Sequence, residues 1–429
     1  MPQTLRRPTP AALGPDVIVG LDLALAEYQA VVLAPTGERL TRFRVPHTRA
    51  GITELLRRTT PRAFGRAGGR VFAFEATGHI WEALAHWLAA AGERYVLVNP
   101  LATFRVREAR TLDRCKTDLT DAEEIAELAR TGLVTRTQLE SAPYVELRRA
   151  WGEYARLRDD RARLKTLLSH QLAGFFPEFL TNWTDVFAPG ALAVLRTGLL
   201  PCEIAALSVP DFLARVRAHQ QGRRLWRHKV EQVHERARVT VACPAGMASL
   251  GREIRRLVTR ADALTAQMDA VEEEIAAQLA ALDEARHLRT IPGLGWVSVA
   301  GLLAHIGSIG KYRHGRQLIK LAGTNPSRRD SGLAVGRAQA MTRRGRAGLR
   351  AVVYCATIAC LQHNPRLRAH YDRLVQRGER PLAKMCAVGA CMNKLLLYAF
   401  AVMKRQQRFD LAHHWTPQGP ARPEVGQAA

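Results

Sequence analysis

The chain has 429 residues, of which 63 are Lys or Arg and 39 are Asp or Glu, so its formal net charge is +24. Apolar residues make up 47%, which excludes a wholly disordered chain, and the length suits about two or three domains. The net charge indicates a polyanionic partner. Arg outnumbers Lys, and the Arg side chain suits phosphates and base edges, but a GC-rich genome produces the same excess of Arg.

The first part of the chain predicts a mixed α/β domain over residues 16–142. Residues 1–15 form a tail without the apolar stretch of a signal peptide. Three β-rich runs follow, DVIVGLDLA, YQAVVLA and LTRFRV, and then a helix, ITELLRRTT. The strand RVFAFEA, the helix HIWEALAHWLAAAG, the strand RYVLVNP and the helical KTDLTDAEEIAELARTG complete the pattern. Hairpin-like strands followed by alternating strands and helices are typical of a mixed sheet.

Four acidic residues in this domain form a candidate metal site. Asp22 lies within an apolar strand, Glu75 ends another, and Asp118 and Asp121 open a helix three residues apart. An acid within an apolar strand is costly unless it is paired or binds a cation. If the two strands are neighbours and the helix packs across them, the four carboxylates converge, and oxygen ligands of this kind select Mg²⁺ or Mn²⁺. Two such ions can activate and clamp the oxygens of a phosphodiester.

Each of these acids also has a simpler interpretation. Asp118 or Asp121 could cap the helix, and Thr120 with Glu123 fits a capping box. Asp22 could lie on an edge strand and face solvent. Lys116 could contact a phosphate or be a solvated lysine.

Residues 143–286 predict a helical arm. Apolar residues recur near heptad spacing in two runs that flank a less regular insert. The first run contains Leu147, Trp151, Tyr154, Leu157, Leu164 and Leu168, and the second contains Leu257, Leu264, Met268, Val271, Ile275 and Leu279. The pattern indicates an antiparallel coiled coil, or two helices packed on a domain.

Residues 287–412 predict a mainly helical domain, and residues 413–429 a tail. The stretch Thr290 to Gly310 is uncharged and long enough to span a bilayer, but Pro292 and five glycines favour a broken pair of helices. The apolar run Leu395 to Met403 is too short to span. The segment IPGLGWVSVAGLLAHIG has the layout of a helix-hairpin-helix, in which Gly293 and Gly295 would present backbone N–H groups to a phosphate.

The most basic segment of the chain follows this motif. Between residues 311 and 350 eleven basic residues accompany a single acid, Asp330, which favours a phosphate-binding surface. Lys320 and Arg316 belong to this set. The candidate nucleic-acid contacts are Lys311, Arg313, Arg328, Arg329, Arg337, Arg343, Arg344, Arg346 and Arg350. Ser331, in AGTNPSRRDSG, is a candidate nucleophile toward phosphorus because neighbouring Arg groups can stabilise developing charge. A turn-forming Ser-Gly pair is the alternative.

The cysteines favour a reduced protein without a disulfide framework. Cys355 and Cys360, like Cys386 and Cys391, form a C-x4-C pair within apolar helical sequence. Zinc sites usually use C-x2-C, so we expect core packing rather than metal binding.

Taken in order, these motifs resemble those of the DEDD-type insertion-sequence transposases, whose better-known members are bridge-RNA-guided DNA recombinases. The likeness covers about residues 16–135 and 287–405. It is carried by the four acids and by IPGLG, AGTNPSRRDSG and TRRGRAGLR.

The resemblance implies a RuvC-like, ribonuclease H-like N-terminal domain whose carboxylates hold Mg²⁺, and a C-terminal domain that supplies Ser331 as a nucleophile forming a transient link to DNA. It also implies a composite active site in a homo-oligomer, a dimer or tetramer, and a structured guide RNA that pairs with donor and target DNA. We therefore expect a cytoplasmic, nucleoid-associated prokaryotic protein with no membrane segment.

The chain departs from the family pattern beside the serine. Members often carry two serines before the glycine, whereas Asp330 precedes Ser331 here. The lysine usual after the Ser-Gly pair is also absent. Ser327 is therefore the second candidate for the nucleophile.

Two other functions fit the same residues. A junction-resolving or repair nuclease would use the metal carboxylates and the helix-hairpin-helix alone, and would leave hydrolysed ends. A non-enzymatic nucleic-acid-binding protein would use the acids only as helix caps.

Overall fold

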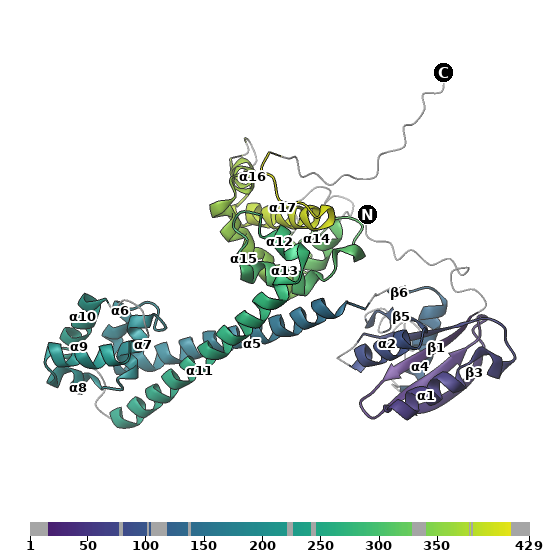
Figure 1. The fold of residues 1–429 in the computed structure, drawn as a ribbon, viewed down its shortest axis with the longest axis horizontal. Coiled ribbons are helices and arrows are strands. Elements are labelled where there is room, and N and C mark those ends of the chain that lie inside the picture. Colours follow the sequence, from purple (N-terminus) through teal and green to yellow (C-terminus); the bar gives the residue numbers. More distant parts are fainter. Residues whose placement is uncertain are drawn as a thin grey trace, which may run out of the picture. The chain divides into compact units, whose positions relative to one another are not determined.

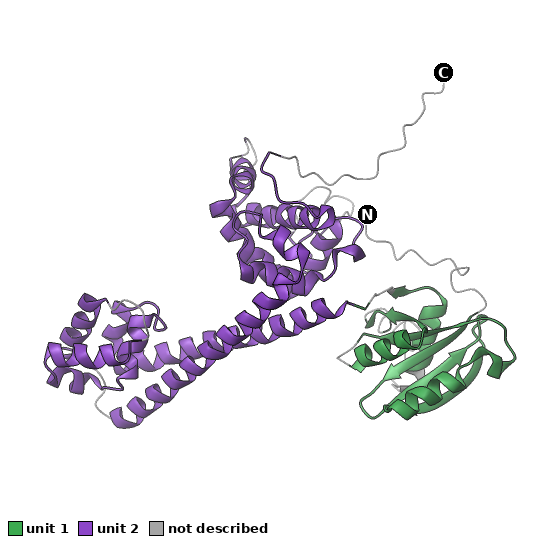
Figure 2. Cartoon of the chain, viewed as in Figure 1, with its two compact units in different colours: residues 1–139 green, residues 140–429 purple. Residues whose placement is uncertain are grey.

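The computed structural model describes residues 16–76, 80–100, 103, 118–135, 139–220, 226–241, 246–327, 340–376, 378 and 381–412. These residues fall into two compact units, residues 1–139 and 140–429, which are coloured separately in Figure 2. Each unit is described by itself.

Unit 1 contains one six-stranded mixed sheet (Figure 1). The order is β3-β2-β1-β4-β5-β6, with β1 antiparallel to β2 and parallel to β4. The strands are β1 (Val17–Leu23), β2 (Glu27–Leu33), β3 (Arg39–Pro46), β4 (Arg70–Glu75), β5 (Arg94–Val98) and β6 (Val134–Thr135). The helical elements are α1 (Arg49–Arg58), η2 (Pro61–Phe64), α2 (Ile80–Ala90) and α4 (Asp118–Arg130). The predicted mixed sheet is confirmed.

Alternation along the strands gives the sheet two apolar faces. Val19 and Leu21 of β1 belong to a cluster with residues of α1 and α2, while Ile18 belongs to a cluster with Ile125 of α4. Because successive strand side chains point to opposite faces, this pattern assigns Gly20 and Asp22 to the α4 face. The sheet is therefore buried on both sides, as its nearly continuous apolar runs require.

Unit 2 is helical among its described residues. Its two longest helices are α5 (Ala142–Phe175) and α11 (Met247–Ala280), each with 34 residues. They are antiparallel, because Leu164 and Leu168 share a core with Leu257, whereas Trp151 and Tyr154 share another with Ile275. The helix pair is as expected from the sequence; coiled-coil packing itself stays a prediction.

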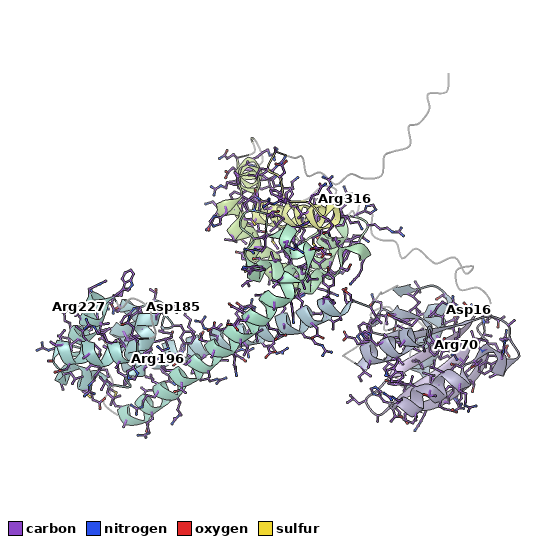
Figure 3. The ribbon with its side chains drawn as sticks, in the orientation of Figure 1. Asp16, Arg70, Asp185, Arg196, Arg227 and Arg316 are labelled. Atoms are coloured by element: carbon purple, nitrogen blue, oxygen red, sulfur yellow. The ribbon has the colours of Figure 1, made fainter. Side chains whose placement is uncertain are left out.

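The insert between these helices is a helical lobe. It consists of α6 (Pro177–Asn182), α7 (Pro189–Arg196), α8 (Pro201–Ala206), α9 (Val209–Ala218) and α10 (Arg227–Ala237). The lobe has its own core around Phe179 and Phe212, which continues onto α5 and α11. Arg196, which is labelled in Figure 3, forms a bidentate ion pair with Asp262 of α11 and so links the lobe to that helix.

The remaining elements pack around the other ends of α5 and α11. They are α12 (Asp283–Leu288), α13 (Trp296–Ile306), η3 (Ile309–Lys311), α14 (Arg316–Ala322), α15 (Ala347–His363), α16 (Pro365–Val375) and α17 (Lys384–Arg405). As predicted, the stretch from Thr290 to Gly310 is broken, because α13 accounts for only part of it.

By length and composition alone, α17 could cross a membrane, and it is longer than the apolar run predicted from the sequence. Leu395, Leu396 and Val402 of this helix are buried in the core of unit 2. Such burial is typical of the central helix of a soluble protein, so α17 gives little support to a membrane assignment.

Candidate functional site

Asp22 and Glu75 occupy matching positions at the carboxyl ends of two neighbouring strands. Strands β1 and β4 are parallel, and Leu21 is paired with Phe74, so the next residues along the register are Asp22 and Glu75. Neighbouring strands lie about 4.8 Å apart, and side chains at matching positions point to the same face. Both side chains are half-buried. The condition set by the sequence, that the two strands be neighbours, is therefore met.

Helix α4 crosses this same face of the sheet. A Cβ on Gly20 would lie only 2.2 Å from the carbonyl oxygen of Ala122, so the absence of a side chain lets the helix contact β1. At the other end of the helix, Arg130 lies beside Gly37, in the turn after β2, and β2 ends opposite the start of β1. The first turn of α4 therefore lies toward the carboxyl end of β1, where Asp22 stands.

Asp121 in this first turn is only 8% exposed. Ile125, four residues later and so on the same side of the helix, packs in the cluster between α4 and the sheet, which places Asp121 on the side that meets the sheet. A helix-capping acid that faces solvent would be exposed. The burial of Asp121 therefore favours a polar site between the helix and the sheet over a capping role. Of Asp118 the structure describes the backbone position at the start of α4, and Lys116 lies outside the described residues.

Gln29 is a neighbour of Asp22 that we did not predict. It lies on β2 directly opposite Asp22 and is 7% exposed. Its Nε2 donates to Glu27 Oε1 over 3.3 Å, and Oε1 has no hydrogen-bond partner among the described residues. The sequence signal is a glutamine within the apolar run YQAVVLA, which becomes informative only when the strand register is known.

The donors on this face fit a divalent cation by chemical type. Asp22, Glu75 and Asp121 offer carboxylate oxygens, and Gln29 adds an amide oxygen. Among the described side chains, however, no group of three or more His, Cys, Asp or Glu residues could hold a metal ion. The metal-binding role of the four acids therefore stays a prediction.

The predicted nucleophile loop has a well-ordered base. Ser331, Arg328, Arg329 and Arg337 lie outside the described residues. On either side of them, Pro326 and Met341 form a β-bridge, and the Ser327 hydroxyl donates to the carbonyl of Ala340 over 3.0 Å. Ser327, the second candidate, is thus half-buried at the base of the loop.

Polar contacts fix this base to α17. The Thr324 hydroxyl donates to Asn393 Oδ1 over 2.6 Å, and Asn393 Nδ2 donates to the Thr324 carbonyl over 3.3 Å. The Thr342 hydroxyl similarly donates to Asn325 Oδ1 over 2.9 Å. The residues on either side of the segment that carries Ser331 are therefore held by hydrogen bonds to each other and to α17.

The predicted phosphate-binding residues divide into two groups. Lys311, Arg346 and Arg350 make contacts within the protein, to Glu140, the His305 carbonyl and the Ala322 carbonyl, and of these three only Arg346 is also exposed. Arg313, Arg343 and Arg344 are exposed, as is Arg316, which is labelled in Figure 3. The exposed group is the more suitable one for phosphate contacts.

The predicted hairpin before α13 contains a glycine in the left-handed region. Gly293 has φ +91°, and a Cβ there would lie 2.6 Å from Cα of Cys360 on α15. Gly295 is the N-cap of α13. The two glycines therefore occupy a tight turn and a helix N-terminus, as the proposed backbone contact requires, while the helix-hairpin-helix assignment stays a prediction.

The prediction that both cysteine pairs pack in the core is right for one member of each pair and wrong for the other. Cys360 and Cys391 are buried in the core of unit 2, and burial raises the pKa of the Cys360 thiol to about 12. Their partners Cys355 and Cys386 are exposed, so each predicted core pair supplies one core residue. Among the residues that the structure describes, none of these four cysteines belongs to a group of side chains that could hold a metal ion.

Comparison with known proteins matches both ends of the chain. Residues 19–177 match a DEDD transposase model, and residues 285–372 match the model described as the transposase IS116/IS110/IS902 family. The candidate mini-circle transposase for IS117 from Streptomyces coelicolor is 24% identical over 94% of this chain and 97% of its own length. An uncharacterized insertion element IS110 protein from the same organism is 24% identical, over 85% of this chain and 88% of its own. A pilin gene-inverting protein of Moraxella bovis is 28% identical over 30% of this chain and 39% of its own length.

Proposed function

Because the chain belongs to the IS110 family of DEDD-type transposases and is a DNA transposase or recombinase, we propose that it cuts and rejoins DNA with two groups of residues. The first group is the carboxylates of unit 1, and the second is Ser331 with its basic surroundings in unit 2. DNA is the substrate that such enzymes act on.

The topology of unit 1 supports a ribonuclease H-like, RuvC-like assignment for residues 16–142. Its antiparallel β3-β2-β1 hairpins are followed by the parallel strands β4 and β5. In this arrangement the acids stand at the carboxyl ends of the central strands, where ligand sites of open α/β sheets also lie.

The observation that carries the proposal is the register of Asp22 with Glu75 beneath the buried Asp121. Asp22, Glu75, Asp118 and Asp121 would hold the divalent metal that the DEDD domain implies, Mg²⁺ or Mn²⁺. The bound metal would supply Lewis-acid stabilisation of the phosphodiester oxygens. The protein's own contribution is to hold the acids on rigid elements, where Gly20 lets α4 come close to the sheet.

Ser331 would then act as the nucleophile at phosphorus. Its Oγ would form a bond to the phosphorus atom while the bond from phosphorus to one deoxyribose oxygen breaks, and the proton lost by the serine hydroxyl would balance the one gained by the leaving oxygen. Arg328, Arg329 and Arg337 would stabilise the charge that develops on the phosphate oxygens. Reversal of the step with a different strand end joins the DNA and frees the serine.

Partners of the enzyme follow from the same family. We propose a homo-oligomer with a composite active site, a structured guide RNA that reads donor and target DNA by base pairing, and action in the prokaryotic cytoplasm. The relative whose name describes pilin gene inversion supports recombination as the reaction. RNA that co-purifies with the chain, and is absent from a nuclease-treated control, would support the guide.

Cleavage of plasmid DNA tests the carboxylate site. We expect Asp118→Asn and Asp22→Asn each to abolish metal-dependent cleavage while the melting temperature stays near that of the parent. Glu123→Gln is the matched control, since Glu123 lies on α4 but is exposed and ion-paired with Arg39. An Asp118→Asn protein that still cleaves DNA would refute the metal proposal.

Trapping of the covalent intermediate tests the serine. We expect a DNA-linked peptide that contains Ser331, and loss of the adduct in Ser331→Ala but not in Ser327→Ala. An adduct that survives Ser331→Ala would exclude Ser331, and its loss only in Ser327→Ala would assign the role to Ser327. Hydrolysed ends without any adduct would instead favour a structure-specific nuclease.

A further inference from the structure

A basic groove lies beside the N-terminus of α13, away from the loop that carries Ser331 along the chain. It is lined by residues from the end of α12, from the turn before α13 and from the segment after α17, among them Arg286, Arg289, Thr290, Pro292 and Arg408. Two acids stand at the same place: Asp283, which pairs with Arg286, and Asp410, which also lines the groove. Arg289 and Arg408 form no ion pair with any described residue, so positive charge remains available.

Beside the groove, an exposed aromatic ring stacks on Arg289, one of the arginines that line it. The guanidinium carbon of Arg289 lies 3.7 Å from the ring centroid of Trp296, and 43% of Trp296 is exposed. Val297, the next residue, is 46% exposed. Trp296 is the first residue of α13, so this exposed side chain belongs to the N-terminal turn of an eleven-residue helix.

The walls of the groove are held in place by hydrogen bonds. The backbone N–H of Phe409 donates to the Thr290 hydroxyl over 2.7 Å, and that hydroxyl donates to the His287 carbonyl over 2.6 Å. The Phe409 ring also lies 5.2 Å from the ring of Tyr398 on α17. These contacts bring Arg408, which follows α17, and Arg289, which follows α12, into the lining of the same groove.

We propose that this groove binds an unpaired stretch of nucleic acid, with a phosphate between Arg408 and the N-terminus of α13 and a base stacked on the Arg289–Trp296 pair. Bases in a duplex are stacked on one another, whereas an unpaired base can stack on an aromatic ring or a guanidinium plane. The positive end of the helix and the arginines suit the phosphate. The site goes beyond the proposed cleavage reaction, because it holds a strand by residues that take no part in it.

Single-stranded DNA and single-stranded RNA both offer this chemistry. The test therefore measures binding of the full chain to three fluorescein-labelled probes of one sequence, namely single-stranded DNA, single-stranded RNA and duplex DNA. Fluorescence anisotropy is recorded with excess EDTA, so the result does not depend on metal, on cleavage or on the serine. Failure of this proposal is thereby distinguishable from failure of the proposed reaction.

We expect Trp296→Ala and Arg289→Ala each to weaken binding of the single strands about tenfold, and binding of duplex DNA by less than about twofold. Trp296→Phe should restore most of the affinity, because a phenyl ring still stacks. Arg163→Ala is the matched control, since Arg163 is an exposed arginine on α5 with an 82% exposed side chain.

The two single strands identify the source of the unpaired segment. A loss confined to RNA assigns the groove to RNA, a loss confined to single-stranded DNA assigns it to a DNA strand, and either result supports the site. Unchanged binding of both single strands by folded Trp296→Ala and Arg289→Ala proteins would overturn the proposal. Equal weakening of all three probes would overturn it as well, because it would show general electrostatic attraction without stacking.

Discussion

At the scale of single residues, Gly20 and Gln29 show what surrounds the candidate catalytic acids. Gly20 lies two positions before Asp22 on the same face of β1, where α4 presses against the strand. Gln29 lies opposite Asp22 on β2 and is buried. The acids could be named as candidates from the sequence because acids in apolar strands are costly. These two neighbours could not, because they depend on strand register and helix packing, which are set by contacts far apart in sequence.

We expect Gly20→Ala to destabilise unit 1 by about 2 kcal/mol or more, because the added Cβ would meet a backbone oxygen that cannot rotate away. Gly174→Ala on α5 is the control: its Cβ meets nothing within 4 Å, and we expect an unchanged or slightly higher stability there. Urea unfolding followed by circular dichroism measures both. A Gly20→Ala protein as stable as the parent would show that α4 does not press on β1 in this way.

His305 lies in a second polar region, at the C-terminal end of α13. Three side chains bind the last carbonyls of this helix: Arg148 at Ala304, Arg346 at His305 and Tyr312 at Ile306. Glu140 pairs with both Arg148 and Lys311 beside them. Burial, followed by repulsion from Arg346 and Arg148, lowers the pKa of His305 from 6.5 to about 4.

A half-buried histidine whose pKa is lowered makes stability depend on pH. Above pH 6.5 the imidazole is neutral in folded and unfolded chains, but between pH 6.5 and about 4 only the unfolded chain takes up the proton. We therefore expect unit 2 to lose stability as pH falls through this window, and His305→Gln to reduce that loss. Melting temperatures from pH 7 to pH 4.5, with the exposed His314→Gln as control, measure the effect; identical slopes for parent and His305→Gln would contradict it.

At the scale of elements, the regular parts of the fold were predictable and the lobe was not. The strands of unit 1 and the helices α5 and α11 have long runs of one hydrophobic period, which local sequence reveals. The helices of the lobe have only six to eleven residues, and four of the five carry a proline near their start. Helices this short are stabilised by packing around Phe179 and Phe212, and this packing cannot be predicted from the local sequence pattern.

The helix pair offers a test within two adjacent residues. Leu168 on α5 is fully buried in the core of the lobe, whereas Leu167 is 42% exposed. We expect Leu168→Ala to lower the free energy of unfolding by about 2–5 kcal/mol, and Leu167→Ala by about 0.5 kcal/mol. Chemical denaturation followed by circular dichroism gives both values. Equal losses at the two positions would mean that α5 does not bury this face.

At the scale of the whole molecule, the basic residues behind the net charge of +24 serve different purposes. Lys311, Arg346 and Arg350 bind carbonyl or carboxylate oxygens of unit 2, while Arg313 and Arg344 remain at the surface. Composition alone indicated a polyanionic partner, but it could not separate cations that brace the fold from cations that are free to bind phosphate. That separation required the three-dimensional contacts.

We therefore expect two kinds of arginine variant. Arg344→Ala and Arg313→Ala should weaken duplex DNA binding, and each should reduce the slope of log affinity against log salt by about one, without lowering the melting temperature. Arg350→Ala should lower the melting temperature instead, because its guanidinium binds the Ala322 carbonyl. Anisotropy at several salt concentrations, with differential scanning fluorimetry, tests this; a salt slope unchanged in Arg344→Ala and Arg313→Ala would contradict the assignment.

The central claim is that the acids of unit 1 form a divalent-metal site, and binding of Mn²⁺ to the full chain tests it most directly. Electron paramagnetic resonance counts free Mn²⁺ and so gives the affinity without any reaction. We expect the parent and the Glu123→Gln control to bind Mn²⁺ alike, and Asp22→Asn and Asp121→Asn to bind it at least about tenfold more weakly at unchanged melting temperature. Equal Mn²⁺ affinity in all four proteins would contradict the account.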